Sequence, residues 1–469
     1  MELEELQVLQ SGNYDDLVKK FIAEKPKKKV DAATINKQLD PSQHDVTDKT
    51  KRQDKTIKKK DDNGKDVTSV VEVARLPIPM QKRIVQVAAA FLCANPIKMD
   101  CQPLDDPQKN LLYVIKKTWD DNKLDYESMG LAEIMMGETE CAELWYVVPA
   151  DDLYWAGTPN EGAANRMRMR VLAPSLGDTL YPVYDITGDM IAFGRGYMVT
   201  VGDKTIEHFD FYTDKNIVLG SKEGGAWTTT PQTNATGKIP IIYYTQPQPE
   251  WTDVQPEIDR IETSTSNNAD TNDYFGSPMM KVGGKVTGFS DKGESGKVIQ
   301  TENGATVEYL TWEQASEAVK LENERLEKVI YSMTDTPNIS FDEMKGLGTF
   351  SGIALKMLFL AAHLKAARKE GIFGKGIQRR INFLKAAMAK INVSAFEKAL
   401  TLNIKPVFEY YLPKNIEEII GLLTEAVGGG KAVMSQESAI RQNPLVTDAD
   451  TEIKKMTDEG LFGTDIANA

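Results

Sequence analysis

Cysteine and histidine are scarce in this sequence, which has three of each among 469 residues. Cys93, Cys101 and Cys141 are widely spaced and form no Cys-x-x-Cys pair. This spacing argues against a disulfide framework and favours a reducing compartment. The three histidines are also far apart in the sequence, so it predicts no zinc site of the usual Cys/His spacing.

Signatures of catalysis and of membrane insertion are missing as well. The sequence contains no GxSxG, HExxH or GxGxxG motif and no phosphate-binding P-loop. No apolar run reaches the roughly 18–20 residues that span a bilayer. The acidic start, Met1-Glu2-Leu3-Glu4-Glu5, lacks the apolar core of a secretory signal. We therefore expect a soluble, intracellular protein that is not an enzyme and binds no cofactor or metal.

Positive charge is in deficit, because 56 Lys and Arg face 69 Asp and Glu, giving a formal net charge of -13. Tight phosphate binding relies on Lys and Arg, so this balance argues against a protein that grips nucleic acid over its whole surface. It is compatible with a protein that only lets DNA pass. The length suggests two to four structural units, and a hydrophobic fraction of 41% is enough for a sizeable core.

Apolar residues spaced three and four apart predict helices near the start of the chain. The predicted ranges are 2–28, 80–94 and 106–121, and a further helix carries Tyr126, Met129, Ile134 and Met135. Between the first two lies a basic run, 49–60, which predicts a solvated loop or a flexible arm. The alternative interpretation is an arm that touches DNA or an acidic partner.

From residue 143 the apolar period changes to two, which is typical of strands. Short strand patterns separated by Gly, Asp and Asn turns continue to the segment 239–244. Together they predict one antiparallel, meandering β unit of about 100 residues.

Two polar helices are predicted next, at 253–275 and 312–333, on either side of a short Gly- and Lys-rich β excursion. Their apolar stripes are too thin to bury them within one subunit. We expect neighbouring copies in an oligomer to cover them. A glycine-containing loop, a long helix over 351–396 that three glycines could kink, a strand over 401–411 and three short C-terminal helices complete the pattern.

The order of these elements resembles the portal, or head–tail connector, proteins of tailed bacteriophages, in the siphovirus subfamily. Several stretches carry the resemblance. They are the strand Ile239-Pro-Ile-Ile-Tyr-Tyr and the acidic helix after it, Val307-Glu-Tyr-Leu-Thr before the second polar helix, Thr334-Asp-Thr-Pro-Asn before the loop, Ser351-Gly-Ile-Ala-Leu-Lys-Met, and the tail with Leu412-Pro-Lys-Asn-Ile-Glu-Glu and Asn443-Pro-Leu-Val-Thr-Asp.

The resemblance implies an α+β fold with a wing of helices and β structure, a two-helix stem, a small β/α clip, a long wing helix and a helical C-terminal crown. The implied boundaries are an N-terminal helix and flexible basic arm at 1–74, wing at 75–252, stem helices at 253–275 and 312–335, clip at 276–311, tunnel loop at 336–350, long wing helix and strand at 351–411, and crown at 412–469.

It also implies a ring, expected to hold twelve subunits, at one capsid vertex of the virion, assembled in the host cytoplasm. The implied partners are the terminase large subunit, a head-completion or adaptor protein, the major capsid and scaffolding proteins, and double-stranded DNA that passes through the channel during packaging and ejection. No membrane is involved. The implied tunnel-loop residues are Pro337, Asn338, Asp342, Glu343, Lys345, Gly346 and Gly348, and the lysines of the clip that face the motor or adaptor are Lys281, Lys285, Lys292 and Lys297.

The charges of the tunnel loop suggest how a channel avoids binding the phosphates of the DNA that passes through it. We expect Asp335, Asp342 and Glu343 to give the channel acidic character and Lys345 to make a sparse, mobile contact. The alternative is that these are ordinary loop charges.

Two other functions remain open at this point. One is a different ring-forming structural or adaptor protein of the virion. The other is an enzyme that uses an acidic pair, Glu138 with Glu140 or Asp105 with Asp106, although neither pair has a matching partner motif and acidic pairs are usually solvated.

Overall fold

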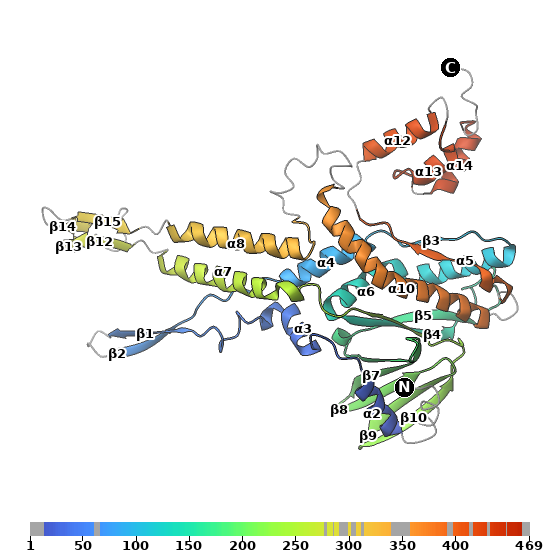
Figure 1. Cartoon of the computed structure of the whole chain (residues 1–469), viewed down its shortest axis with the longest axis horizontal. Helices are drawn as coiled ribbons and strands as arrows, with labels where there is room; N and C mark the ends of the chain where they lie inside the picture. The colour runs from blue at the N-terminus through green and yellow to red at the C-terminus, as the bar shows by residue number, and fades with distance from the viewer. Residues whose placement is uncertain are drawn as a thin grey trace.

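The computed structural model describes most of the chain and shows an elongated molecule, with helices and two sheets at one end and a pair of helices projecting from them (Figure 1). The described residues are 14–60, 66–275, 279–284, 286–289, 299–301, 306–310, 314–338, 357–391, 397–411, 416–428, 432–446 and 448–461. Within them, no helix is both long and apolar enough to cross a membrane.

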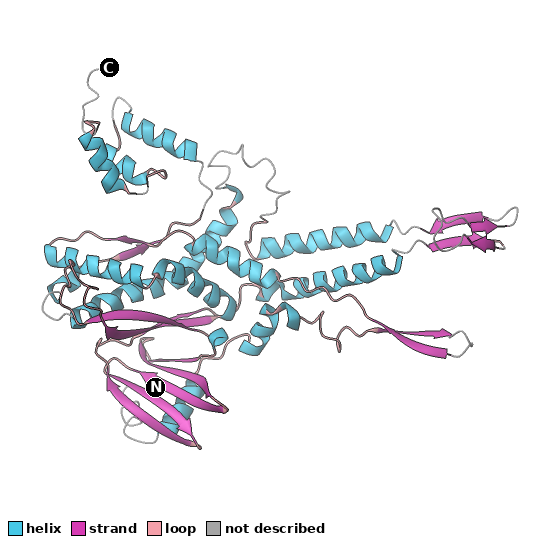
Figure 2. Ribbon diagram, turned by 180° about the vertical axis from the view of Figure 1, so that it is seen from behind, coloured by secondary structure: helices cyan, strands magenta, loops and turns pink. Residues whose placement is uncertain are grey.

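Four helices form the helical layer of the body (Figure 2). They are α4 (Met80–Cys93), α5 (Asp106–Asp121), α6 (Leu124–Glu138) and α10 (Leu360–Ile391), and their apolar faces meet in the main core. The start of α5 follows from local chemistry, because the Asp105 carboxylate accepts a hydrogen bond from the Gln108 amide at 2.9 Å. The periodicity predicted all four helices, and the long helix expected over 351–396 is observed over Leu360–Ile391.

A three-stranded sheet lies against these helices, in the order β11 (Ile241–Thr245), β4 (Glu140–Pro149), β5 (Asn165–Leu172). The long helix α10 packs very closely on it: a Cβ on Gly376 would stand 2.1 Å from the Tyr244 ring. This glycine therefore serves close helix–sheet contact, and all three glycines that were expected to kink the helix lie inside the single helix α10.

A second, five-stranded sheet packs on the other side of the first. Its order is β10 (Ala226–Thr233), β9 (Asn216–Glu223), β8 (Lys204–Tyr212), β7 (Met190–Val201), β6 (Thr179–Tyr184). The prediction of one meandering unit was wrong in this respect. Only β6 to β10 form a meander, whereas β4, β5 and β11 pair with one another.

The N-terminal helix α2 (Tyr14–Glu24) covers the outer face of the five-stranded sheet. Leu17 and Phe21 insert against Phe209 and Phe211, and Phe21 meets both of these rings edge-on. Between the two sheets lies a separate apolar cluster that includes Phe193 and Tyr212. Helix α2 thus belongs to the body rather than to a detached segment.

The projecting pair consists of α7 (Gln255–Phe275) and α8 (Gln314–Met333), which pack side by side. At its far end lie two short antiparallel ladders (Figure 1). They pair β12 (Met279–Gly283) with β15 (Thr306–Leu310) and β13 (Val286–Phe289) with β14 (Ile299–Thr301). The predicted pair of polar helices on either side of a β excursion is confirmed.

The basic run forms regular structure, which corrects the prediction of a solvated loop or flexible arm. After α3 (Ala32–Leu39) and a short 3-10 helix (Pro41–Gln43), the chain forms a hairpin of β1 (Lys55–Lys60) and β2 (Asp66–Val71). The hairpin projects past the ends of α7 and α8, toward the same end of the molecule as β12 and β15 (Figure 1). Strand β1 reads Lys-Thr-Ile-Lys-Lys-Lys, and such a charge-rich sequence gives no apolar signal for a strand.

The C-terminal part begins with a 3-10 helix (Glu397–Thr401) and a short strand β16 (Lys405–Val407), which pairs with β3 (Lys98–Asp100). The strand expected over 401–411 is therefore shorter than predicted. Three helices follow, α12 (Ile416–Gly428), α13 (Gln436–Gln442) and α14 (Ala449–Asp458), as the sequence predicts. The two last helices are capped by Ser435 and Asp448.

Candidate assembly interface and channel loop

The middle of helix α7 buries a polar ridge. Glu262, Ser266 and Asp270 follow one another at intervals of four residues, so they lie along one side of the helix. Glu262 is 1% exposed and Ser266 is 0% exposed. Buried polar groups require hydrogen-bond partners, so another segment has to supply donors along this ridge.

The donors come from the backbone that follows the hairpin. The amide of Ile78 donates to Glu262 at 2.8 Å, that of Leu76 to Ser266 at 3.0 Å, and that of Ala74 to Asp270 at 2.6 Å. Two residues of extended chain advance about 6.6 Å and four residues of helix about 6.0 Å. Alternate amides therefore match successive steps of the ridge. Pro77 and Pro79 favour the extended backbone that this match needs.

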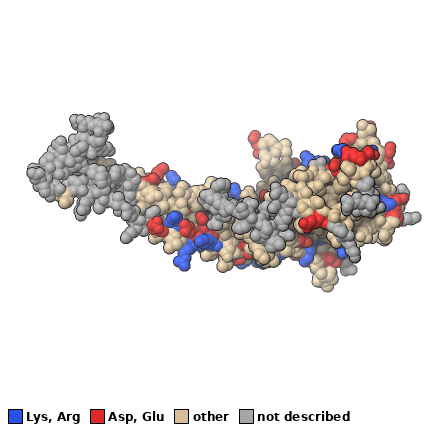
Figure 3. Space-filling view, turned by 90° about the horizontal axis from the view of Figure 1, so that it is seen from above, with Lys and Arg blue, Asp and Glu red and all other residues tan. Residues whose placement is uncertain are grey.

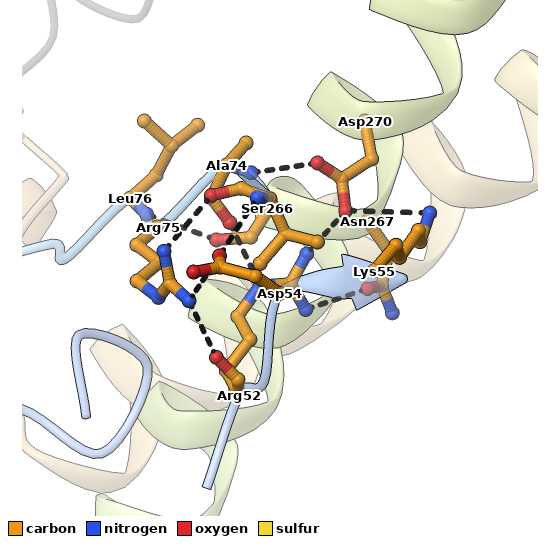
Figure 4. Close-up of polar contacts among 10 residues, drawn as sticks. Arg52, Asp54, Lys55, Ala74, Arg75, Leu76, Ser266, Asn267 and Asp270 are labelled. Atoms are coloured by element: carbon orange, nitrogen blue, oxygen red, sulfur yellow. Dashed lines mark hydrogen bonds and ion pairs between the residues drawn. The ribbon is translucent and has the colours of Figure 1, made fainter. Parts of the chain in front are cut away.

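Two arginines fasten the base of the hairpin to α7 and to itself (Figure 4). Arg52 donates to Asp270 at 2.7 Å, to Asn267 at 2.8 Å and to the Ala74 carbonyl at 2.7 Å. Arg75 donates to Asp54 at 2.6 Å, which ties the two ends of the hairpin together. The fixed fork of each guanidinium gives these contacts a defined geometry. We call residues 41–54 and 72–78, which flank the hairpin, the strap.

A buried histidine adds a titratable contact between the strap and α7. His44 Nδ1 lies 2.6 Å from Glu262 Oε1, and Nε2 lies 2.9 Å from the Gln38 carbonyl. Both partners are acceptors, so only the protonated imidazole donates to both. Burial acts to lower the pKa of His44, but the Glu262 carboxylate outweighs it, with a smaller contribution from Asp259, and the pKa is raised.

On its other side, α7 contacts α8. Arg260 pairs with Glu322 at 2.7 Å, and Asn323 donates to Thr265 at 3.4 Å. Helix α8 exposes three large apolar side chains at intervals that are multiples of four, with exposed Arg325 on the same row. Leu321 is 59% exposed, Val329 is 40% exposed and Met333 is 69% exposed. We call these three side chains the outer ridge of α8.

The prediction that both stem helices lack cover within their own subunit therefore holds only in part. The strap covers the polar ridge of α7, and no periodicity argument revealed that cover because the covered side chains are polar. The three side chains of the outer ridge of α8 stay 40–69% exposed in the described part of the chain.

The loop that follows α8 starts from a buried anchor. The Lys365 ammonium donates to the Thr334 carbonyl at 2.7 Å, and the Thr334 hydroxyl donates back to the Ile330 carbonyl at 2.7 Å. Asp335 then takes the left-handed conformation, with φ of 50°. A non-glycine residue in this conformation is uncommon and marks a sharp change of direction. The chain leaves the stem helix here in a defined direction.

Glu250 holds this anchor in place. Its carboxylate lies 3.2 Å from Lys365 and also contacts the Lys369 ammonium. Burial acts to raise the pKa of Glu250, but the two ammonium groups outweigh it and the pKa is lowered. Burial lowers the pKa of Lys365, opposed by Glu250. The same groups line a cavity of about 260 Å³ beside Asp335.

A second buried ion pair joins α10 to the three-stranded sheet. Arg380 and Glu143 are both 0% exposed, and their closest atoms are 2.6 Å apart. Arg380 also donates to Ser128 at 2.8 Å, and Trp145 donates to Glu143 at 2.8 Å. The two charges are buried and paired, so the pair fixes where the long helix lies on the sheet. No sequence motif pointed to either residue.

Comparison with known proteins places the chain in a family. The model of the family "Phage portal protein, SPP1 Gp6-like" matches residues 25–460. The chain belongs to this family of phage portal proteins. It is also similar to the portal protein of Bacillus phage SPP1, with 24% identity over 287 residues, which is 56% of this chain and 55% of that protein. The match thus spans about half the length of that portal relative.

Two solved structures are distantly similar. One is the neck of an empty GTA particle computed with C6 symmetry, and the other is the neck of a native GTA particle computed with C12 symmetry. The first has a TM-score of 0.38 and 12% identity, covering 76% of this chain and 88% of the other. The second has a TM-score of 0.38 and 12% identity, covering 77% of this chain and 89% of the other.

Few of the predicted channel and clip residues of this portal-family chain lie among the described residues. Pro337 is half-buried and Asn338 is exposed, directly after the Thr334 anchor. The backbone of Lys281 belongs to β12. The predicted residues outside the described part are Asp342, Glu343, Lys345, Gly346, Gly348, Lys285, Lys292 and Lys297. Their assignment to the tunnel loop and the clip stays a prediction.

The acidic pairs considered for an enzyme have structural partners. Glu138 accepts a hydrogen bond from the Ser175 amide at 2.8 Å, and Glu140 pairs with Lys25 at 3.0 Å. Asp105 caps α5, and Asp106 pairs with a lysine one turn on, at 2.9 Å. On the face shown in Figure 3, acidic and basic side chains are interspersed in small groups, without a continuous patch of either sign over the described residues.

Proposed function

We propose that this protein assembles into the portal ring at one vertex of a phage capsid, where DNA enters during packaging and leaves during ejection. The family match over residues 25–460 carries the proposal. The uncovered outer ridge of α8 supports it, because exposed apolar side chains on a projecting helix suit a contact with a neighbouring copy. In this proposal the ring has twelve subunits and resides in the virion, after assembly in the host cytoplasm.

The proposed division of labour follows the elements. The body, comprising 75–252 and 351–411, acts as the wing, and α7 with α8 forms the stem. The β12–β15 end serves as the clip that meets the terminase large subunit or an adaptor protein, the segment after Thr334 serves as the tunnel loop, and residues 412–469 form the crown. The wing is the surface that we expect to meet capsid and scaffolding proteins.

The charge of the chain suits a conduit. Twelve copies at -13 each carry about -156 charges in all, which repels phosphate where it faces the channel. Strong Lys–phosphate contacts would slow the moving DNA. The proposed protein performs no chemistry itself, so nucleotide hydrolysis for packaging belongs to the separate terminase motor.

Electron microscopy of the purified full-length protein, followed by packaging with the matching terminase and procapsids, tests the proposal. A ring with a central channel that supports packaging is the expected result. A ring that joins heads to tails without any role in packaging would favour a structural adaptor. Absence of rings at every protein concentration tested would overturn the proposed function.

The proposed tunnel loop has a test of its own. Deletion of 340–348, which lie outside the described residues, should leave rings intact because the loop follows the buried anchor at Thr334. Packaging should stop, since the loop is proposed to contact DNA in the channel. Normal packaging by the deletion variant would show that the loop is only a connector.

A further inference from the structure

Strand β5 carries three arginines on one face of the three-stranded sheet. Arg166, Arg168 and Arg170 occupy alternate positions, so their side chains leave the same face of the sheet at intervals of about 6.6 Å. The residues between them, Met167 and Met169, belong to the main core on the other face. We call the three arginines the β5 stripe.

The stripe reaches beyond the cover of the five-stranded sheet. In the ladder with β4, Arg170 pairs with Leu144 and Arg168 pairs with Tyr146. Leu144 packs against the apolar cluster between the two sheets, whereas Tyr146, two residues further along β4, is 41% exposed. The five-stranded sheet therefore covers this face as far as Leu144 and leaves Tyr146 and its arginine neighbours in contact with solvent.

Most of the charge of the stripe is unpaired. Arg166 lies 3.6 Å from Asp151, whose side chain is 81% exposed, and its guanidinium lies 4.9 Å from the ring centroid of Tyr154. Such an exposed ion pair contributes little to stability. Arg168 and Arg170 form no ion pair and no side-chain hydrogen bond with the described residues. Two of the three guanidinium groups are therefore open to a partner.

The backbone under the stripe is held in place. Strand β5 lies at the edge of its sheet, but the Asn122 side chain donates to the Met167 carbonyl at 3.1 Å and accepts from the Met169 amide at 3.0 Å. The Trp155 indole donates to the Asn165 carbonyl at 3.0 Å. Because three backbone groups of this edge are taken, an added strand cannot pair along its whole length. A partner therefore has to lie on the face of the strand, where the arginines have a preset spacing.

We propose that the β5 stripe binds a segment of a partner protein that carries a row of carboxylates about 6–7 Å apart. Alternate residues of an extended chain have this spacing, and so do residues four apart on a helix. Each guanidinium can bind a carboxylate through two parallel hydrogen bonds, so the recognition is geometric as well as electrostatic. The strap shows the same match of spacings within this molecule, where alternate amides meet Glu262, Ser266 and Asp270 of α7.

The residue types of this surface favour a protein over a nucleic acid as the occupant. Arg and Tyr are enriched at protein interfaces and Lys is depleted, and the stripe with Tyr146 contains no lysine. Duplex DNA would use the three cations but would leave Tyr146 uncovered, and few phosphate contacts on a chain of net charge -13 give weak binding. A protein segment brings carboxylates for the arginines and apolar atoms for Tyr146. The inference concerns each subunit by itself and does not depend on the ring.

Peptide binding to the full-length protein tests the stripe. Two short fluorescent peptides carry spaced glutamates, one at alternate positions between threonines and one at every fourth position of an alanine helix, and a third carries its glutamates in one block. We expect a spaced peptide to bind more tightly than the block peptide. Arg168→Gln with Arg170→Gln should weaken that binding about tenfold in fluorescence anisotropy.

Two variants control for charge and for geometry. Arg368→Gln with Arg379→Gln removes the same charge from exposed positions of α10 and should have little effect. Arg168→Lys with Arg170→Lys keeps the charge but loses the guanidinium fork, so it should give an intermediate loss. The unfolding temperature of each variant, which should stay unchanged because these side chains have no partner in the described residues, reports that the protein is folded.

The remaining outcomes would overturn the inference. Absence of binding by every peptide, equal binding of spaced and block peptides, or an equal loss in the α10 control would each refute recognition by the stripe. Tighter binding of a short DNA duplex, abolished by the same two substitutions, would assign the stripe to nucleic acid. Weaker ring assembly of the Arg168→Gln, Arg170→Gln variant would assign it to a second copy. Failure of the unsubstituted protein to form rings would instead overturn the proposed function and leave the peptide result standing.

Discussion

Removing the Asp270 carboxylate should release the strap from the stem helix at the base of the hairpin. In Asp270→Ala, the Ala74 amide loses its acceptor at 2.6 Å and Arg52 loses its ion pair at 2.7 Å. Arg52 keeps its bonds to Asn267 and to the Ala74 carbonyl, so the loss is partial. Hydrogen bonds to charged groups are each worth about 1.5–3 kcal/mol when buried.

The magnitude is set by solvent access. The Asp270 side chain is 13% exposed, so water can reach part of the vacated site and the cost falls toward the lower end of that range. We expect the free energy of local opening to drop by about 2 kcal/mol, which is roughly a thirtyfold faster exchange of the Ala74 amide. The Leu76 amide, one ridge step away, should change less, and the Ile78 amide least.

Hydrogen exchange resolved at single amides measures this gradient. Asp270→Asn keeps a neutral acceptor and should show an intermediate effect of about tenfold. Asp273→Ala, on the same helix but exposed, removes an equal charge and should leave all three amides unchanged. If the Ala74 amide in Asp270→Ala exchanges within about twofold of its rate in the unsubstituted protein, Asp270 does not hold the strap on α7.

Three further predictions concern buried charges. Arg380→Met should lower the free energy of unfolding by about 3–5 kcal/mol in denaturant titrations, since it strands a buried carboxylate, whereas exposed Arg379→Met should have little effect. The strap contact of His44 should be strongest below about pH 6.5 and weaken as the pH rises through its raised pKa, and His44→Gln should remove that pH dependence of amide exchange in the strap. Lys365→Met should free the Thr334 carbonyl and speed proteolysis just after α8, and a cleavage rate like that of the unsubstituted protein would show that the anchor does not hold the loop.

Local sequence patterns were sufficient for most helices and most strands, but α3 (Ala32–Leu39) had no predicted counterpart. Periods of 3.6 and 2 arise from residues a few positions apart, so α5, the stem helices and the strands of the meander could be found without long-range information. The order of these elements also carried the resemblance to phage portal proteins, which the family match over residues 25–460 confirms.

Only the tertiary structure decided which of these elements meet. The division of the β unit into two sheets depends on β11 pairing with β4, about 100 residues earlier in the chain. The strap reaches α7 across 190 residues between Leu76 and Ser266, and Arg380 reaches Glu143 across 237 residues. These contacts join polar or charged side chains, which read as solvent-exposed in any local window. These side chains become buried only because folding brings a distant partner to them. The amino-acid pattern alone therefore predicted a flexible arm where the hairpin forms, and it predicted no cover for α7 within its own subunit.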